Sequence, residues 1–210
     1  MRAILLLMLA LSSFPVFGQK TDSLAVERAI DSLIKVGVQY RNEQRFEENI
    51  QVAQAAASLV LEHFGEKHRA YAFCLHAEGY GYYMMGDNEK ALPVMMRARE
   101  TRERTFGKEN GLYLRCLTSL FLINKELGRY EEAETYIREF IALNQKMSGK
   151  ESDGYILGLK NLGNFLSGRR RFSASDSCWQ EVIGLQINIH GANHPEVGWA
   201  CVEYAYMLRN

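Results

Sequence analysis

Apolar residues recur at intervals of three and four along most of the chain, which is the spacing of one face of an α-helix. The clearest run is Ala133, Tyr136, Ile137, Phe140, Ile141 and Met147. Leu117, Leu120 and Phe121 mark the helix before it. The pattern predicts an all-α protein, with helices over residues 22–43, 46–63, 67–85, 88–105, 109–127, 130–147, 151–169, 172–189 and 194–209.

An internal repeat groups these helices in pairs. Residues 64–105, 106–147 and 148–189 are three successive units of 42 residues, and the connections carry a glycine at one constant place, at Gly65, Gly107, Gly149 and Gly191. Residues 19–63 fit the frame loosely as a divergent N-terminal hairpin, and residues 190–210 hold the first helix of an incomplete unit. A fixed period of this length is typical of an α-solenoid, in which each unit buries its apolar face against its neighbours.

Short turns join the two helices of each unit. Gly86 and Gly128 stand where a helix would end, and glycine readily adopts the left-handed conformation of a C-cap. Before the last helix we expect Asn193 to act as the N-cap, with Pro195 in the first turn and Glu196 reaching back. Each unit is therefore predicted to be an antiparallel helical hairpin.

Residues 1–18 differ from the rest and predict a signal peptide. Arg2 is followed by an apolar run from Ala3 to Leu11, and Gly18 is the small residue before the expected cleavage, which leaves Gln19 as the first mature residue. The alternative is an uncleaved membrane anchor, but the run is short of the roughly 20 residues that span a bilayer. We expect an exported protein, periplasmic or extracellular, with no membrane span after cleavage.

The four cysteines need an interpretation because export permits disulfides. Cys74 and Cys116 occupy one place in consecutive units, on helices too far apart for a bond, so we expect buried free thiols. Cys178 and Cys201 fall on adjacent antiparallel helices and are close enough in the frame for pairing to stay open.

Composition and motifs argue against several chemistries. Lys plus Arg and Asp plus Glu balance at 25 each, so we expect no nucleic-acid partner. His190 and His194 lie on either side of Gly191 and not on one helix face, which disfavours a metal site with Cys178 or Cys201. Arg169, Arg170 and Arg171 are interpreted as a solvated turn, and we expect no catalytic residue and no cofactor.

Residues at fixed positions of the units resemble tetratricopeptide repeats, in the long form of kinesin light chains. The matching residues are Gly79, Tyr82, Gly86, Ala91 and Met95 in the first clear unit, Gly128, Tyr130, Ala133 and Ile137 in the second, and Gly163, Phe172 and Trp179 in the third. The 42-residue length and the His194-Pro195 linker also look like that type. Phe121, Arg170 and Ser175 depart from the pattern.

The resemblance implies a right-handed superhelix that binds proteins or peptides through its concave face, without catalysis of its own. The first helices line that face in the family. Carried onto this sequence, the groove residues are His76, Tyr80, Tyr83, Arg115, Thr118, Leu122, Lys125, Lys160, Asn161, Asn164, Trp199 and Tyr206, with Ser119, Ser167 and Val202 beside them. Asn161 is the residue expected to hold a peptide backbone.

Two other functions stay open. Similar bacterial proteins often continue into a caspase-like peptidase or a signalling kinase, for which such a module would be the sensor. The chain would otherwise be a structural adaptor that self-associates end to end. Trp199, Tyr204, Tyr206 and Leu208 are expected to be exposed on the last helix, because in the repeat frame that helix has no second helix to pack against.

Overall fold

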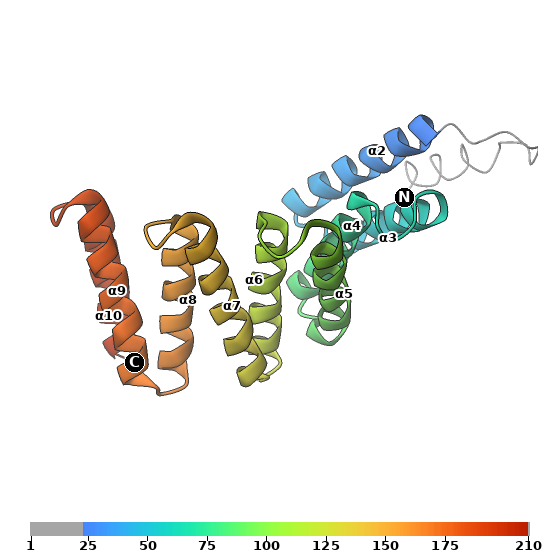
Figure 1. Cartoon of the computed structure of the whole chain (residues 1–210). Coiled ribbons are helices and arrows are strands. Elements are labelled where there is room, and N and C mark those ends of the chain that lie inside the picture. The colour runs from blue at the N-terminus through green and yellow to red at the C-terminus, as the bar shows by residue number, and fades with distance from the viewer. Residues whose placement is uncertain (1–22, 210) are drawn as a thin grey trace, which may run out of the picture. The chain divides into compact units, whose positions relative to one another are not determined.

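The computed structural model describes residues 23–209, so the expected signal peptide lies outside the described residues. Every regular element in this range is an α-helix (Figure 1). The chain divides into two compact units after Thr105. The helices of the first are α2 (Ser23–Asn42), α3 (Phe46–His63), α4 (Arg69–Met84) and α5 (Asn88–Phe106). Those of the second are α6 (Gly111–Glu126), α7 (Tyr130–Ser148), α8 (Asp153–Gly168), α9 (Phe172–His190) and α10 (Pro195–Arg209).

These helices confirm the predicted all-α fold of four hairpins plus one further helix. Each observed helix begins and ends within two residues of the range expected from the apolar spacing. Among the described residues, no helix is both long enough and apolar enough to cross a membrane.

Side-chain caps at one repeat position begin the first helices. The amide oxygen of Asn110 accepts hydrogen bonds from the backbone N–H groups of Leu112 and Tyr113, both at 3.0 Å, at the start of α6. At the start of α8, the hydroxyl oxygen of Ser152 accepts one hydrogen bond, from the backbone N–H of Tyr155 at 3.4 Å. The prediction for α10 was wrong, because the cap is His194 and not Asn193. His194 lies 42 residues after Ser152, and its Nδ1 accepts from the backbone N–H of Glu196 at 3.3 Å.

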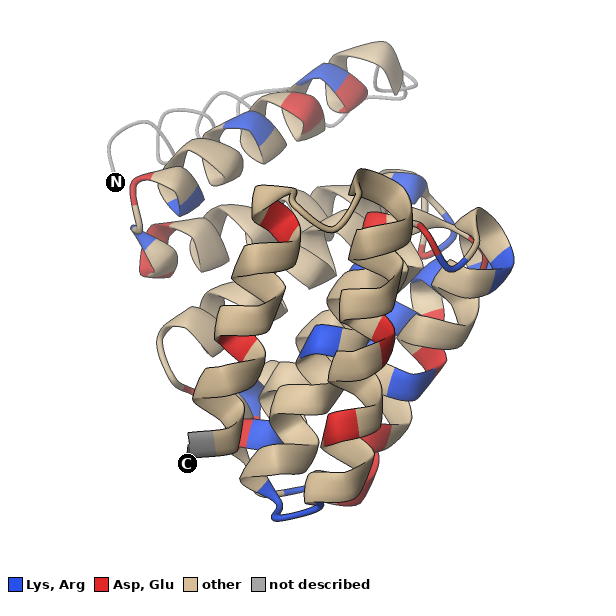
Figure 2. Cartoon of the chain, turned by 90° about the vertical axis from the view of Figure 1, so that its left-hand side faces the viewer, with Lys and Arg blue, Asp and Glu red and all other residues tan. Residues whose placement is uncertain are grey.

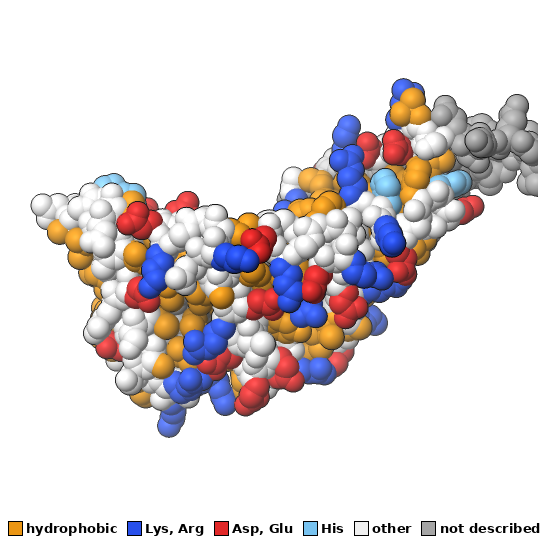
Figure 3. Space-filling model, viewed as in Figure 1, with side chains coloured by type: hydrophobic (Ala, Val, Ile, Leu, Met, Phe, Trp, Pro, Cys, Tyr) orange, Lys and Arg blue, Asp and Glu red, His pale blue; other side chains and the backbone are white. Residues whose placement is uncertain are grey.

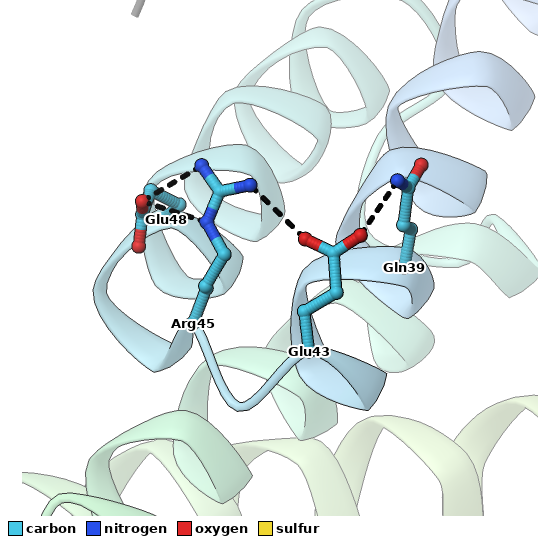
Figure 4. Close-up of polar contacts among 4 residues, drawn as sticks. All are labelled: Gln39, Glu43, Arg45 and Glu48. Atoms are coloured by element: carbon cyan, nitrogen blue, oxygen red, sulfur yellow. Dashed lines mark hydrogen bonds and ion pairs between the residues drawn. The ribbon is translucent and has the colours of Figure 1, made fainter.

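The turns inside the hairpins need a left-handed residue whatever its type. Gly86 and Gly128 have φ of 79° and 71°, as the sequence predicted. Gln44 and Arg170 occupy the same repeat position and adopt φ of 59° and 57°, although a side chain makes this conformation unfavourable. In the turn of Gln44, the neighbouring Arg45 bridges Glu43 and Glu48 (Figure 4).

In two of the hairpins, a glycine on the first helix faces a large side chain on the second. A Cβ on Gly79 would lie 3.1 Å from Cε of Met95, and a Cβ on Gly163 would lie 2.8 Å from Nε1 of Trp179. In the repeat of residues 106–147 the same position holds Phe121. Its side chain is buried, and its ring meets that of Phe165 edge-on, with centroids 5.7 Å apart. A bulky residue is thus accommodated here by packing into the core of the second unit.

Ser175 departs from the family pattern without disturbing the contact. Its side chain is fully buried, and its hydroxyl donates a hydrogen bond to the carbonyl oxygen of Gly163 at 2.7 Å. The extra oxygen therefore has a partner on the facing helix, which removes the cost of burying it.

The cysteines are free thiols. Cys74 and Cys116 are buried, as expected, and burial raises the pKa of the Cys74 thiol to about 12. Cys178 is half-buried and Cys201 is exposed, and the two do not form a disulfide.

Candidate protein-binding face

The predicted groove residues fall on first helices in both units. His76, Tyr80 and Tyr83 lie on α4 in the first unit. His76 is only 7% exposed and its ring stacks on Tyr80, with centroids 6.4 Å apart and planes at 9°. The ring of Tyr83 lies a further 6.4 Å along. These residues form one aromatic row along α4, in which Tyr80 and Tyr83 are half-exposed.

On α6 the predicted residues differ in what remains accessible. Arg115 is exposed, and Lys125 pairs with Glu126 at 3.3 Å. Thr118 donates its hydroxyl to the carbonyl oxygen of Leu114, and Leu122 packs against the apolar core of the second unit. Thr118 and Leu122 therefore contribute in part to the fold, whereas Arg115 faces solvent.

On α8 the polar residues share one strip. Asn161 is half-buried and Asn164 is exposed. Lys160 lies beside them, and its ammonium pairs with the carboxylate of Glu203 on α10 at 3.0 Å. This ion pair ties the accessible strips of α8 and α10 together within the second unit.

The last helix exposes two of the predicted aromatic residues. The side chains of Trp199 and Tyr206 are 64% and 65% exposed, while Val197, Ala200 and Met207 form the buried side of α10. The expected exposure of Tyr204 was wrong. Its ring stacks near that of Trp179 with centroids 6.4 Å apart, and its hydroxyl donates to Asp176 on α9.

A cleft opens where α8 ends and α10 passes the turn into α9. Its lining comes from all three helices and from the turn, and consists of Asn164, Ser167, Gly168, Arg170, Phe172, Glu203, Tyr206 and Met207. The groove prediction included Asn164, Ser167 and Tyr206 but missed Arg170, Phe172 and Glu203. The signal for Arg170 was a charged residue at a position that carries glycine in two other units.

The metal-ligating side chains of the described residues do not gather in one place. No cluster of three His, Cys, Asp or Glu side chains in this range is arranged to hold a metal ion. His190 ends α9 and His194 precedes α10, so the two do not share one helix face, as expected, although they meet across the connection. Their rings stack with centroids 4.4 Å apart. Lys and Arg alternate with Asp and Glu on the face seen in Figure 3, so that face has no broad patch of one sign.

Comparison with known proteins agrees with this architecture. The tetratricopeptide repeat profile matches residues 159–196. Among curated proteins no sequence matches the chain significantly. Solved structures do match, including putative kinesin light chain TPR-like repeats from Podosopora anserina, at 14% identity and a TM-score of 0.76 over 86% of this chain and 85% of that one.

Two further structures have the same fold. BtubC (BKLC) from P. vanneervenii matches at 15% identity and a TM-score of 0.73, over 90% of this chain and 75% of that one. A Rap protein complexed with competence and sporulation factor matches at 15% identity and a TM-score of 0.64, over 77% of this chain and 43% of that one. Helical repeat scaffolds of this kind typically bind proteins. Residues 159–196 therefore match a tetratricopeptide repeat, and the chain has the fold of the kinesin light chain-like repeat proteins.

Proposed function

We propose that this protein is an exported, non-enzymatic scaffold that binds a protein or peptide segment along its first helices. The observation that carries the proposal is the strip on α8 and α10, where Asn164 and the exposed Tyr206 line one cleft and Lys160, next to Asn161, pairs with Glu203. An extended peptide needs donors and acceptors for its backbone and apolar surfaces for its side chains. This strip supplies both.

Asn161 is the central residue of the proposal. An amide donates and accepts at once, so it can pair with both the N–H and the C=O of a bound backbone. The Asn161 side chain makes no hydrogen bond with the rest of residues 23–209, so its amide is available to a peptide backbone. The similar Rap structure, which is complexed with competence and sporulation factor, supports a binding role for the fold.

The test is capture of partners from the exported fraction with purified wild type and Asn161→Ala. We expect the variant to lose about 0.5–1.5 kcal/mol of binding free energy, because one neutral hydrogen-bonding group is removed. Asn188→Ala is the matched control, since Asn188 is an exposed asparagine on the second helix α9.

Circular dichroism verifies that both variants are folded. Equal capture by wild type and Asn161→Ala, and also by a Tyr80→Ala, Lys125→Ala double variant, would exclude the first helices as the binding surface.

Export is a separate part of the proposal and rests on the sequence of residues 1–18. We expect the mature protein to begin at Gln19 and to be found outside the cytoplasm. N-terminal sequencing of the protein purified from its native cells measures this. An intact Met1 on protein from the soluble cytoplasmic fraction contradicts it.

A further inference from the structure

The turn between α8 and α9 holds an arginine in a conformation that suits glycine. Arg170 has φ of 57°, and the equivalent residues of the two preceding units are Gly86 and Gly128. A side chain destabilises the left-handed conformation, because its Cβ approaches the following carbonyl oxygen. Strain of this kind often marks a functional position when a side chain is kept there. The folded chain therefore carries a conformational free-energy cost at Arg170 that the repeats with Gly86 and Gly128 do not have.

The three arginines of this turn differ in what they contact. The guanidinium of Arg169 lies over the ring of Tyr130, 3.8 Å from its centroid. Arg171 forms an ion pair with Glu134 on α7. Arg170 lines the cleft instead, and within residues 23–209 its guanidinium has no ion pair, hydrogen bond or ring contact. Figure 2 shows this basic turn at the bottom of the second unit, beside the end of α10.

Arg170 is the charged residue of the cleft lining whose side chain has no ion-pair partner within residues 23–209. Glu203 is the acidic residue of the lining, and its carboxylate is paired with Lys160. The side chain of Lys160 is 22% exposed and that of Glu203 is 52% exposed, so this ion pair is partly open to solvent. Among the lining residues, the positive charge available to a ligand is therefore that of Arg170.

Apolar rings border the same cleft. Phe172 is 51% exposed and Tyr206 is 65% exposed, although both are aromatic. Asn164 and Ser167 add an amide and a hydroxyl to the lining of the cleft. Exposed rings next to a guanidinium match a ligand with a carboxylate next to an apolar side chain, because arginine pairs with carboxylates through two parallel hydrogen bonds.

We propose that this cleft is a subsite for a carboxylate that stands beside an aromatic or aliphatic residue in the bound peptide. The inference rests on the proposed function and names the chemistry of its ligand. The carboxylate comes from an Asp or Glu side chain or from the peptide's own C-terminus. Both sources present the same planar group to Arg170, with the neighbouring apolar side chain against Phe172 and Tyr206.

The experiment is selection of a displayed library of random heptapeptides on the wild type, followed by affinity measurements with the enriched peptides. We expect enrichment of acidic residues or free C-termini next to Phe, Tyr or Leu. Each enriched peptide is then measured with its acid changed to the amide and with its C-terminus amidated. The change that weakens binding identifies the source of the carboxylate.

Arg170→Gly is the decisive variant because the proposal predicts opposite changes in its binding and its stability. Affinity for the enriched peptides should fall about tenfold or more through loss of a charge-assisted contact. The melting temperature should rise by about 1–4 °C through relief of the strained turn.

Two controls separate the contributions. Arg171→Gln removes the same charge outside the cleft, and Gln44→Gly relieves the same strain in the other unit. Neither should change peptide affinity more than about twofold.

The outcomes distinguish this inference from the proposed function. If the wild type enriches no peptide, peptide binding itself is contradicted, and the subsite with it. If peptides are enriched without an acidic preference, or bind Arg170→Gly as tightly as wild type, then the subsite is wrong while peptide binding stands.

Discussion

Glycines inside the helices of the second unit have very different surroundings. A Cβ on Gly163 would lie 2.8 Å from Nε1 and 3.0 Å from Cδ1 of Trp179, whose side chain is fully buried. Gly184, on the facing helix α9, has no atom within 4 Å of such a Cβ. Gly163 permits a close contact between two helices. Gly184 permits no such contact, and its main effect is to make the unfolded chain more flexible.

Gly163→Ala and Gly184→Ala should therefore change stability in opposite directions. The first should destabilise by about 1–3 kcal/mol, because a fixed indole cannot move away from the added methyl group. The second should stabilise by about 0.5–1 kcal/mol through helix propensity. Denaturant unfolding of both variants measures this. A loss of stability in Gly184→Ala equal to that in Gly163→Ala would mean that the helix contact is wrongly placed.

At the scale of elements, a repeated polar cluster fastens each first helix to its second helix. In the third unit the hydroxyl of Tyr155 on α8 donates to Glu181 on α9 at 2.9 Å, and Lys150 from the preceding connection pairs with the same carboxylate at 2.9 Å. The equivalent cluster one unit earlier is Lys108, Tyr113 and Glu139. In the first clear unit the charges are reversed, with Glu66 in the connection and Arg97 on α5. The ion pair therefore joins the same two positions in all three repeats, while the acidic and the basic residue exchange places in the first of them.

This cluster should make part of the stability depend on pH. Lys150, and then Tyr155, hold the pKa of Glu181 below its ordinary value of 4.5. Because the folded pKa is the lower one, the contribution is present above about pH 4.5 and is lost as the pH falls through the folded value.

Thermal melts of wild type and Glu181→Gln test this dependence. We expect the variant to be less stable by about 0.5–1 kcal/mol at pH 7, with the difference shrinking toward pH 3. Glu151→Gln, an exposed change in the connection, controls for net charge. A difference that stays constant from pH 7 to pH 3 would contradict this role of the carboxylate.

At the scale of the whole molecule, α10 has a second accessible face besides its groove side. Gly198, Cys201, Ala205 and Leu208 are exposed, and Leu208 is 61% exposed. The residues 42 positions earlier are Ile156, Leu159, Gly163 and Leu166, all buried in α8. This face therefore has the composition of a packed helix surface.

We expect this face of α10 to cause self-association. Light scattering over a wide range of protein concentration should show dimers or larger species, because apolar surface of this kind favours association. Leu208→Glu should give monomers, whereas Ile187→Glu, at an exposed apolar position on α9, should not. A monodisperse monomer of the wild type at every concentration would contradict the expectation.

The sequence by itself determined the helices, the 42-residue repeat and the glycine turns, because all three depend on residues a few positions apart. Spacings of three and four set the helix faces, and a left-handed turn position is recognisable once glycine occupies it in some units. The close contact at Gly79 is consistent with the resemblance, and Gly163, two repeats later, faces Trp179 as Gly79 faces Met95.

The tertiary structure alone decided which polar and aromatic side chains are accessible. Tyr204 is half-buried because its hydroxyl donates a hydrogen bond to Asp176 and its ring stacks near that of Trp179. Both partners are more than 20 residues away in the sequence. Arg170 faces the cleft while its two neighbours are engaged by Tyr130 and Glu134. The apolar pattern of the sequence does not determine the exposure of such side chains. Their contacts are with residues that come close only when several helices pack together.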